Sequence, residues 1–151
     1  VYGTYGEVLN ESILTTKISQ FPEQVGENEE FIRQHWLGGR TADCIGLIKG
    51  YAWFNCDTGQ IEYRSNGVRD TGSDPMLDMA TEKGTIDTMP DIPGIAVWMD
   101  GHIGIYVGGG QTIHAANTEL GVIMTPLAQS GWTHWLKIPY ISYDEPIEKE
   151  N

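Results

Sequence analysis

Basic residues, cysteines and long apolar runs are all scarce in this 151-residue sequence. It has 9 lysines and arginines against 21 aspartates and glutamates, which gives a net charge of −12. Proteins that bind nucleic acid displace counterions from phosphates with basic side chains, and anionic membrane surfaces attract the same side chains. The acidic balance therefore argues against both partners, and we expect no nucleic-acid binding.

The sequence has only two cysteines, Cys44 and Cys56. Small scaffolds stapled by disulfides have many more, although the count still allows one bridge. No pair of cysteines or histidines has the spacing of a metal site, so we expect neither a metal nor another cofactor. No run of 18 apolar residues occurs, so we expect no transmembrane helix. The first residues also lack the basic start and apolar stretch of a signal peptide.

The length is that of one domain with a core of ordinary size. Hydrophobic residues make up 40% and charged residues 20% of the sequence, values that are ordinary for a globular protein. We predict a single domain over residues 1–143, followed by an acidic tail over residues 144–151. Four acidic residues surround one lysine in that tail, and we interpret it as a solvated end.

Three helices are predicted in the first half. After a glycine-containing turn, residues 7–20 carry apolar side chains at helical spacings and stop before a proline. Asn28 can cap a second helix that ends at two glycines. Thr41 or Asp43 can cap a third helix, which is apolar nearly all round and ends near residue 54. Its two internal glycines imply that another element packs closely against it.

The second half changes character. A loop or short hairpin is expected over residues 55–71, and then a short helix capped by Asp74 and ended by Gly84. Short β-rich runs follow, separated by tight turns, as in antiparallel hairpins. They cover residues 95–99, 103–107, 112–115, 121–124 and 135–138. The sequence therefore predicts an α+β fold, with N-terminal helices packed on a C-terminal antiparallel sheet of about five strands.

Cys44 is the first candidate for chemistry. It lies at the start of the third predicted helix, where the helix dipole and unpaired amide groups stabilise a thiolate and lower the pKa of a thiol. Taken alone, however, a cysteine in an apolar helix is more often a core residue. Cys56 is placed by the pattern at the end of the same helix, and we interpret it as a structural thiol.

Two histidines add to this candidate. His102 opens a predicted strand after a tight turn, where it can act as the base that a cysteine nucleophile needs. His114 lies on the next strand and can hold the His102 ring in one tautomer if the two strands pair. The alternatives are a surface histidine for His102 and a buried, hydrogen-bonded histidine for His114. A further segment, residues 131–135, is aromatic enough either to stack on a sugar or to pack in the core.

Several segments resemble the NlpC-type cell-wall cysteine peptidases, a circularly rearranged branch of the papain-like fold. The closest is GHIGIYVG at residues 101–108, which is similar to the histidine segment of that family. DCIGL at 43–47 resembles its nucleophile motif, and PGIAVW at 93–98 resembles a strand before the histidine. IHA at 113–115 falls where the third catalytic residue is expected, and VYG at 1–3 is similar to the entry motif.

The resemblance implies a role for each of five residues. Cys44 would attack the scissile carbonyl, His102 would be the base and then the acid, and His114 would orient His102. Backbone amides near Cys44, with the Tyr2 hydroxyl, would stabilise the oxyanion. Asp43 would bind the free amine of a stem peptide, besides capping its helix.

The implied function is a peptidoglycan hydrolase of the endolysin-like kind. It would cut stem peptides between D-glutamate and the following diamino acid, through a thioester. The protein would act on the cell wall from outside the cell, or as a lysin encoded by a phage or mobile element. The alternatives are an N-acetylmuramoyl-L-alanine amidase, a bridge peptidase, an acyltransferase and a non-catalytic wall-binding module.

Three departures from the family pattern concern the surroundings of the site. Ile45 stands where the family has serine, which removes a hydroxyl from the substrate cleft. Ile95 stands where it has aspartate, which costs a structural hydrogen bond. The connection over residues 4–42 is longer than usual and can reshape or cover the cleft.

Overall fold

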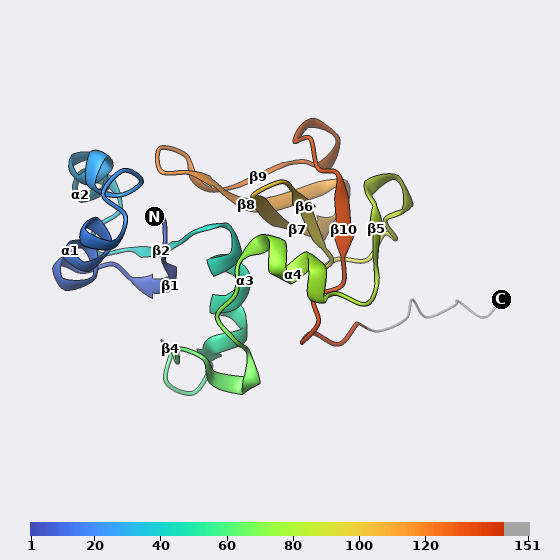
Figure 1. Ribbon diagram of the computed structural model, residues 1–151, viewed down its shortest axis with the longest axis horizontal. Helices are drawn as coiled ribbons and strands as arrows, with labels where there is room; N and C mark the ends of the chain where they lie inside the picture. The colour runs from blue at the N-terminus through green and yellow to red at the C-terminus, as the bar shows by residue number, and fades with distance from the viewer. Residues whose placement is uncertain (144–151) are drawn as a thin grey trace. The chain divides into compact units, whose positions relative to one another are not determined.

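The computed structural model describes residues 1–143, so the predicted acidic tail at 144–151 lies outside the described residues. The chain forms two compact units that alternate along the sequence (Figure 1). The first unit holds residues 1–71 and 114–123, and the second holds residues 72–113 with the segment that starts at Met124. The single domain over residues 1–143 remains a prediction.

The first unit combines three α-helices with two small two-stranded sheets. Strands β1 and β2 pair with each other, and so do β3 and β4. In chain order the elements are β1 (Tyr5–Val8), α1 (Glu11–Gln20), α2 (Glu29–His35), β2 (Arg40–Ala42), α3 (Cys44–Trp53), β3 (Phe54–Asn55) and β4 (Gln60–Ile61). The β3–β4 pair confirms the short hairpin predicted after the third helix.

The start predicted for the first helix was wrong. Residues 5–8 form strand β1, which pairs antiparallel with β2 through Tyr5↔Ala42. Helix α1 begins only at Glu11, because the Asn10 side chain accepts a hydrogen bond of 2.8 Å from the Ile13 amide and so caps the helix there. Strand β1 is fixed by its pairing with β2, more than thirty residues later in the chain. The residues of β1 themselves show no alternation of apolar and polar side chains, so the sequence pattern did not predict a strand there.

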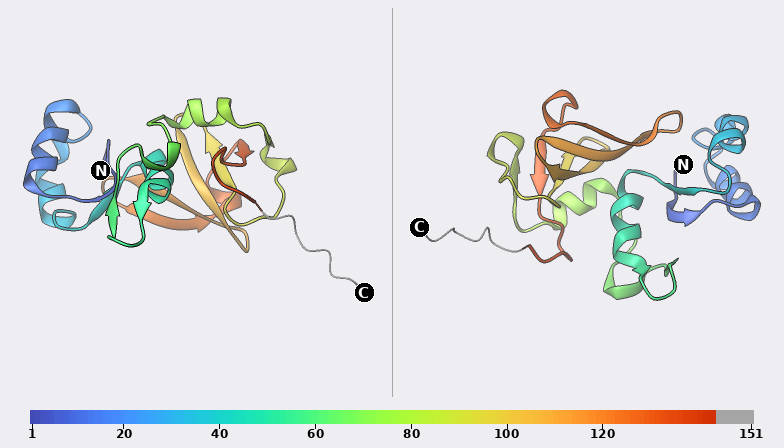
Figure 2. Two further views of the ribbon diagram at one scale, coloured as in Figure 1. Left: turned by 90° about the horizontal axis from the view of Figure 1, so that it is seen from below. Right: turned by 180° about the vertical axis from the view of Figure 1, so that it is seen from behind.

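Helices α1 and α2 lie side by side and share one small core (Figure 2). Its buried members are Leu9, Leu14, Val25 and Ile32. Helix α2 begins directly after Asn28, as predicted, although the Asn28 side chain makes no capping bond. The long connection between Gly3 and Asp43 is therefore a folded segment with its own apolar core.

Helix α3 is capped by Asp43, and Thr41 lies in strand β2 instead. The predicted close approach to its glycines is confirmed. A Cβ atom on Gly46 would lie 2.0 Å from the Thr4 carbonyl oxygen, and one on Gly50 would lie 2.0 Å from the Tyr5 carbonyl oxygen. Only glycine lets the backbone of β1 come this near the helix.

The position predicted for Cys56 was wrong. Helix α3 ends at Trp53, and Cys56 follows β3 as an exposed residue. The chain leaves the helix at Phe54, whose backbone is extended. Cys56 is therefore a surface thiol of the β3–β4 turn.

The second unit is built on a sheet whose strand order is β5-β10-β6-β7-β8-β9. The end of β8 and the start of β9 belong to the first unit. Every register recorded for these strands is antiparallel. The elements are α4 (Ser73–Met79), β5 (Lys83–Thr85), β6 (Ala96–Met99), β7 (His102–Gly108), β8 (Gln111–Asn117), β9 (Gly121–Pro126) and β10 (His134–Leu136).

The five predicted strands are confirmed, and the α+β class with them, but the sheet has a sixth strand. Gly84, predicted to end a helix, lies in β5 and pairs with Trp135. Helix α4 stops earlier, at Met79, and Asp74 lies inside it rather than at its cap. In the described part of the chain, no helix is long and apolar enough to cross a membrane.

Candidate functional site

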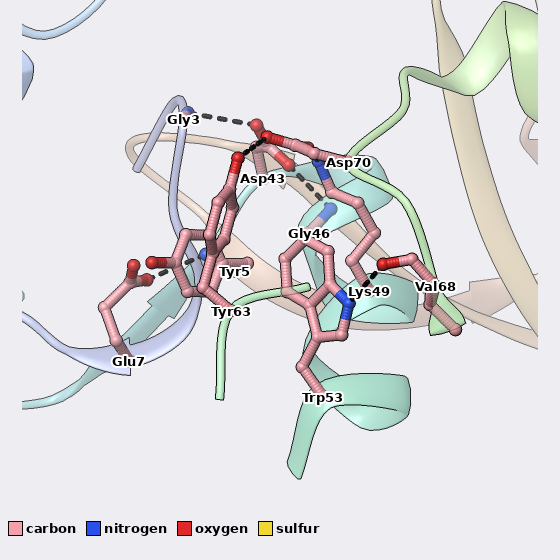
Figure 3. Close-up of polar contacts among 10 residues, drawn as sticks. All are labelled: Gly3, Tyr5, Glu7, Asp43, Gly46, Lys49, Trp53, Tyr63, Val68 and Asp70. Atoms are coloured by element: carbon pink, nitrogen blue, oxygen red, sulfur yellow. Dashed lines mark hydrogen bonds and ion pairs between the residues drawn. The ribbon is translucent and has the colours of Figure 1, made fainter. Parts of the chain in front are cut away.

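Cys44 is the first residue of α3 and is partly buried. The residue before it, Asp43, uses both carboxylate oxygens. Oδ1 accepts a hydrogen bond of 2.7 Å from the Gly46 amide, and Oδ2 accepts one of 3.0 Å from the Gly3 amide (Figure 3). The first bond caps the helix, and the second ties the N-terminal segment to it. The candidate nucleophile thus lies at a helix start where Asp43 bonds both the helix and the N-terminal segment.

Tyr2 adjoins this anchor. Its side chain is 48% exposed, and its ring makes an edge contact with Phe21, with centroids 4.8 Å apart. The next residue, Gly3, has a φ of 78° and donates the bond to Asp43. The structure therefore ties the backbone beside Tyr2 to Asp43, while the Tyr2 ring packs on Phe21.

His102 lies in the second unit, as the first residue of β7. The turn before it contains Gly101, whose φ of 72° suits glycine. Across the strand pair His102 faces Met99. Its ring stacks on the Trp132 indole, with centroids 5.3 Å apart and planes inclined by 12°. The predicted position at a strand start is confirmed.

Asp74 holds the turn that precedes His102. Its Oδ1 accepts hydrogen bonds from the Gly101 amide at 3.4 Å and from the Trp98 indole N–H at 3.1 Å. Asp74 is therefore a brace between α4 and the β6–β7 hairpin. The sequence pattern assigned it only to a helix cap.

His114 lies on β8 and is buried. Burial lowers its pKa below the ordinary value, because the charged imidazolium loses solvation. The shift favours the neutral imidazole. Strands β7 and β8 pair through Ile105↔Ile113, so the hairpin on which its predicted role depended is confirmed.

One cluster in the first unit escaped the sequence analysis. Lys49 is buried in α3 and forms an ion pair of 2.5 Å with Asp70, which also accepts a 2.6 Å hydrogen bond from the Tyr63 hydroxyl (Figure 3). Burial alone would raise the pKa of Asp70, but the bonds from Lys49 and Tyr63 lower it below its ordinary value. The cluster fastens the segment after β4 to helix α3. The feature of the sequence that could have indicated this cluster is a lysine in an otherwise apolar helix.

Nucleophile and base candidates come from different units. Tyr2, Asp43, Cys44 and His114 belong to the first, and His102 belongs to the second. Within residues 1–143, no group of three or more His, Cys, Asp or Glu side chains could hold a metal ion. The first unit thus holds a thiol at a helix start and a buried imidazole, and the second holds an imidazole stacked on an indole.

Comparison with known proteins gives one result. The model of the NlpC/P60 family matches residues 32–139, a range that includes Asp43, Cys44, His102 and His114. No curated protein and no solved structure matches the chain.

Proposed function

Since the chain belongs to the NlpC/P60 family, a family of cell-wall peptidases, we propose that it is a cysteine endopeptidase of peptidoglycan. It cuts stem peptides between D-glutamate and the following diamino acid. The observation that carries the proposal is Cys44 at the first position of a helix capped by Asp43. Such a position stabilises a thiolate, which is the nucleophilic form of cysteine. The protein works on the wall from outside the cell, or as a lysin of a phage or mobile element.

The proposed reaction has two steps. In the first, His102 takes the Cys44 proton, the sulfur attacks the scissile carbonyl carbon, and His102 returns the proton to the leaving amine as the C–N bond breaks. In the second, His102 takes a proton from water, the hydroxide attacks the thioester, and the C–S bond breaks as His102 returns the proton to the Cys44 sulfur. The products are a free amine and a free carboxylate.

Three further groups support these steps in the proposal. His114 orients the His102 ring, a role that its neutral state suits. A neutral partner holds the ring less strongly than a carboxylate would. Backbone amides at the start of α3 and the Tyr2 hydroxyl stabilise the oxyanion of each tetrahedral intermediate.

Asp43 is proposed to bind the free amine of the stem peptide while it caps α3, and two substitutions separate these roles. Asp43→Ala removes both hydrogen bonds and should cost about 0.5–2 kcal/mol of stability. Asp43→Asn keeps one acceptor oxygen and should lower Tm less, yet it lacks the charge. Losing a charge-assisted contact of about 1.5–3 kcal/mol should raise KM about tenfold or more.

The control for Asp43 is a matched substrate. A stem peptide with an acetylated amine cannot make the charged contact, so the wild type and Asp43→Asn should cleave it with the same KM. Steady-state kinetics on both peptides and a thermal melt of each variant provide the measurements. An Asp43→Asn variant whose KM for the free-amine peptide equals that of the wild type would contradict the binding role.

The bond specificity is tested by digesting purified peptidoglycan and identifying the fragments by mass spectrometry. We expect fragments that end in D-glutamate and new fragments that begin with the free amine of a diamino acid. Release of intact stem peptides from the sugar would show an amidase instead, and cut bridges would show a bridge peptidase. Binding to the wall without any new fragment would show a non-catalytic module.

A further inference from the structure

The indole of Trp132 lies face to face with the imidazole of His102, both within the second unit. Trp132 is only 5% exposed and belongs to a core cluster with Val97 and Tyr106. Its ring is thus held by packing, and one face of it is occupied by His102. Of the aromatic segment at 131–135, Trp132 therefore packs in the core.

The hairpin that carries His102 is held on both faces of the sheet. Successive side chains along a strand point to opposite faces, so Trp98 and Met99 of β6 lie on opposite faces of the sheet. Trp98 binds Asp74 of α4 on one face. Met99 packs against the Trp132 cluster on the opposite face. His102 is the cross-strand partner of Met99, so its side chain points to that same face. The backbone of the turn and the ring of the histidine are restrained by separate contacts.

We propose that Trp132 is a positioning residue for His102, a role that rests on the function proposed above. The N–H and the lone pair of an imidazole lie in the plane of its ring, so the plane decides where a proton can be accepted or delivered. The χ2 torsion of histidine has a broad, weak preference. Parallel stacking at 12° restrains the tilt that this torsion would otherwise permit.

The consequence concerns the rate of the chemical steps rather than substrate binding. Trp132 lies behind the histidine and is buried, so it offers no surface to a peptide. Misplacing a catalytic group by about 1 Å can cost about 10²-fold in rate. Loss of the stack should therefore lower kcat and leave KM nearly unchanged.

Three variants test this proposal on a soluble stem peptide. Trp132→Leu keeps an apolar side chain but removes the flat face, and its kcat should fall roughly 10- to 100-fold with KM within about twofold of the wild type. Trp132→Phe restores a flat ring and should recover most of the rate. Leu136→Ala truncates a buried side chain outside the Trp132 cluster, so it should lower Tm while keeping kcat.

A second readout does not depend on catalysis. An aromatic ring current shifts the NMR signals of protons above its face, so the His102 ring C–H signals should move upfield in the wild type and in Trp132→Phe. They should return toward ordinary values in Trp132→Leu. Unshifted signals in the wild type would overturn the stack and the proposal with it.

The outcomes separate the two levels of inference. If Cys44→Ala is inactive while Trp132→Leu is folded and fully active, the positioning role is wrong and the proposed function stands. If Leu136→Ala loses as much kcat as Trp132→Leu, the effect is one of stability and the positioning role is again wrong. If Cys44→Ala still cleaves the peptide, the proposed function is wrong, and the positioning role that rests on it falls too.

Discussion

Replacing Cys44 by alanine is expected to reduce peptidoglycan hydrolysis by at least about 10³-fold, because no other group of the proposed site can form the thioester. The fold should survive. Alanine is a good helix former, and the cap that begins α3 comes from Asp43 rather than from Cys44. Release of soluble fragments from purified wall gives the rate, and circular dichroism with a thermal melt checks the fold.

The second cysteine of the chain supplies the matched control. Cys56 is exposed in the β3–β4 turn, so Cys56→Ala should keep full activity. A thiol-alkylating reagent should inactivate both the wild type and Cys56→Ala. Undiminished hydrolysis by Cys44→Ala would rule out the thioester mechanism. Loss of activity in Cys56→Ala would show that Cys44 is wrongly assigned as the nucleophile.

Replacing Gly50 by alanine is expected to destabilise the fold. The new methyl carbon would lie 2.0 Å from the Tyr5 carbonyl oxygen and 3.0 Å from the Tyr5 carbonyl carbon, so the backbone of β1 must move. Overpacking costs about 1–3 kcal/mol and sometimes more, against a gain of about 1 kcal/mol in helix propensity. Because the obstruction is backbone rather than a flexible side chain, we expect a net loss of about 2 kcal/mol.

A loss of that size should lower Tm by roughly 4–8 °C in a protein of this length. Gly39→Ala is the control in the same unit, since Gly39 is exposed and a Cβ there would meet its nearest neighbour, the Trp36 carbonyl oxygen, at an ordinary 3.5 Å. Its Tm should stay within about 2 °C of the wild type. A Gly50→Ala protein as stable as Gly39→Ala would show that β1 does not need the close approach.

The local features of the site were predictable because neighbouring residues encode them. Asp43 before an apolar run indicates a capped helix start, and the Asp-Gly turn before His102 indicates a strand start. Both are confirmed, and so is the pairing of β7 with β8. The catalytic roles of Cys44, His102 and His114 were inferred from a family motif and stay predictions, of which the Cys44 variant tests the first and the Trp132 variants bear on the second.

Other features could not be predicted because they depend on which distant segments meet. Strand β5 is short and contains Gly84, so nothing local distinguishes it from a helix end until it pairs with β10. Asp74 begins a helical run by its sequence pattern, yet its carboxylate accepts bonds from Trp98 and Gly101, more than twenty residues away. Sequence patterns indicate periodicity and turns. Which distant residues become hydrogen-bond or strand partners is determined only when the chain folds.

The sequence by itself determined the α+β class, the capped start of α3, the strand that His102 opens and the family to which the chain belongs. Each of these depends on side chains within one turn, one strand or one motif. Only the tertiary structure decided that β1 passes against Gly50, that Asp74 braces the His102 turn and that Trp132 covers the His102 ring. These contacts join residues far apart along the chain, and their energy comes from burial and close packing, which exist only after the segments meet.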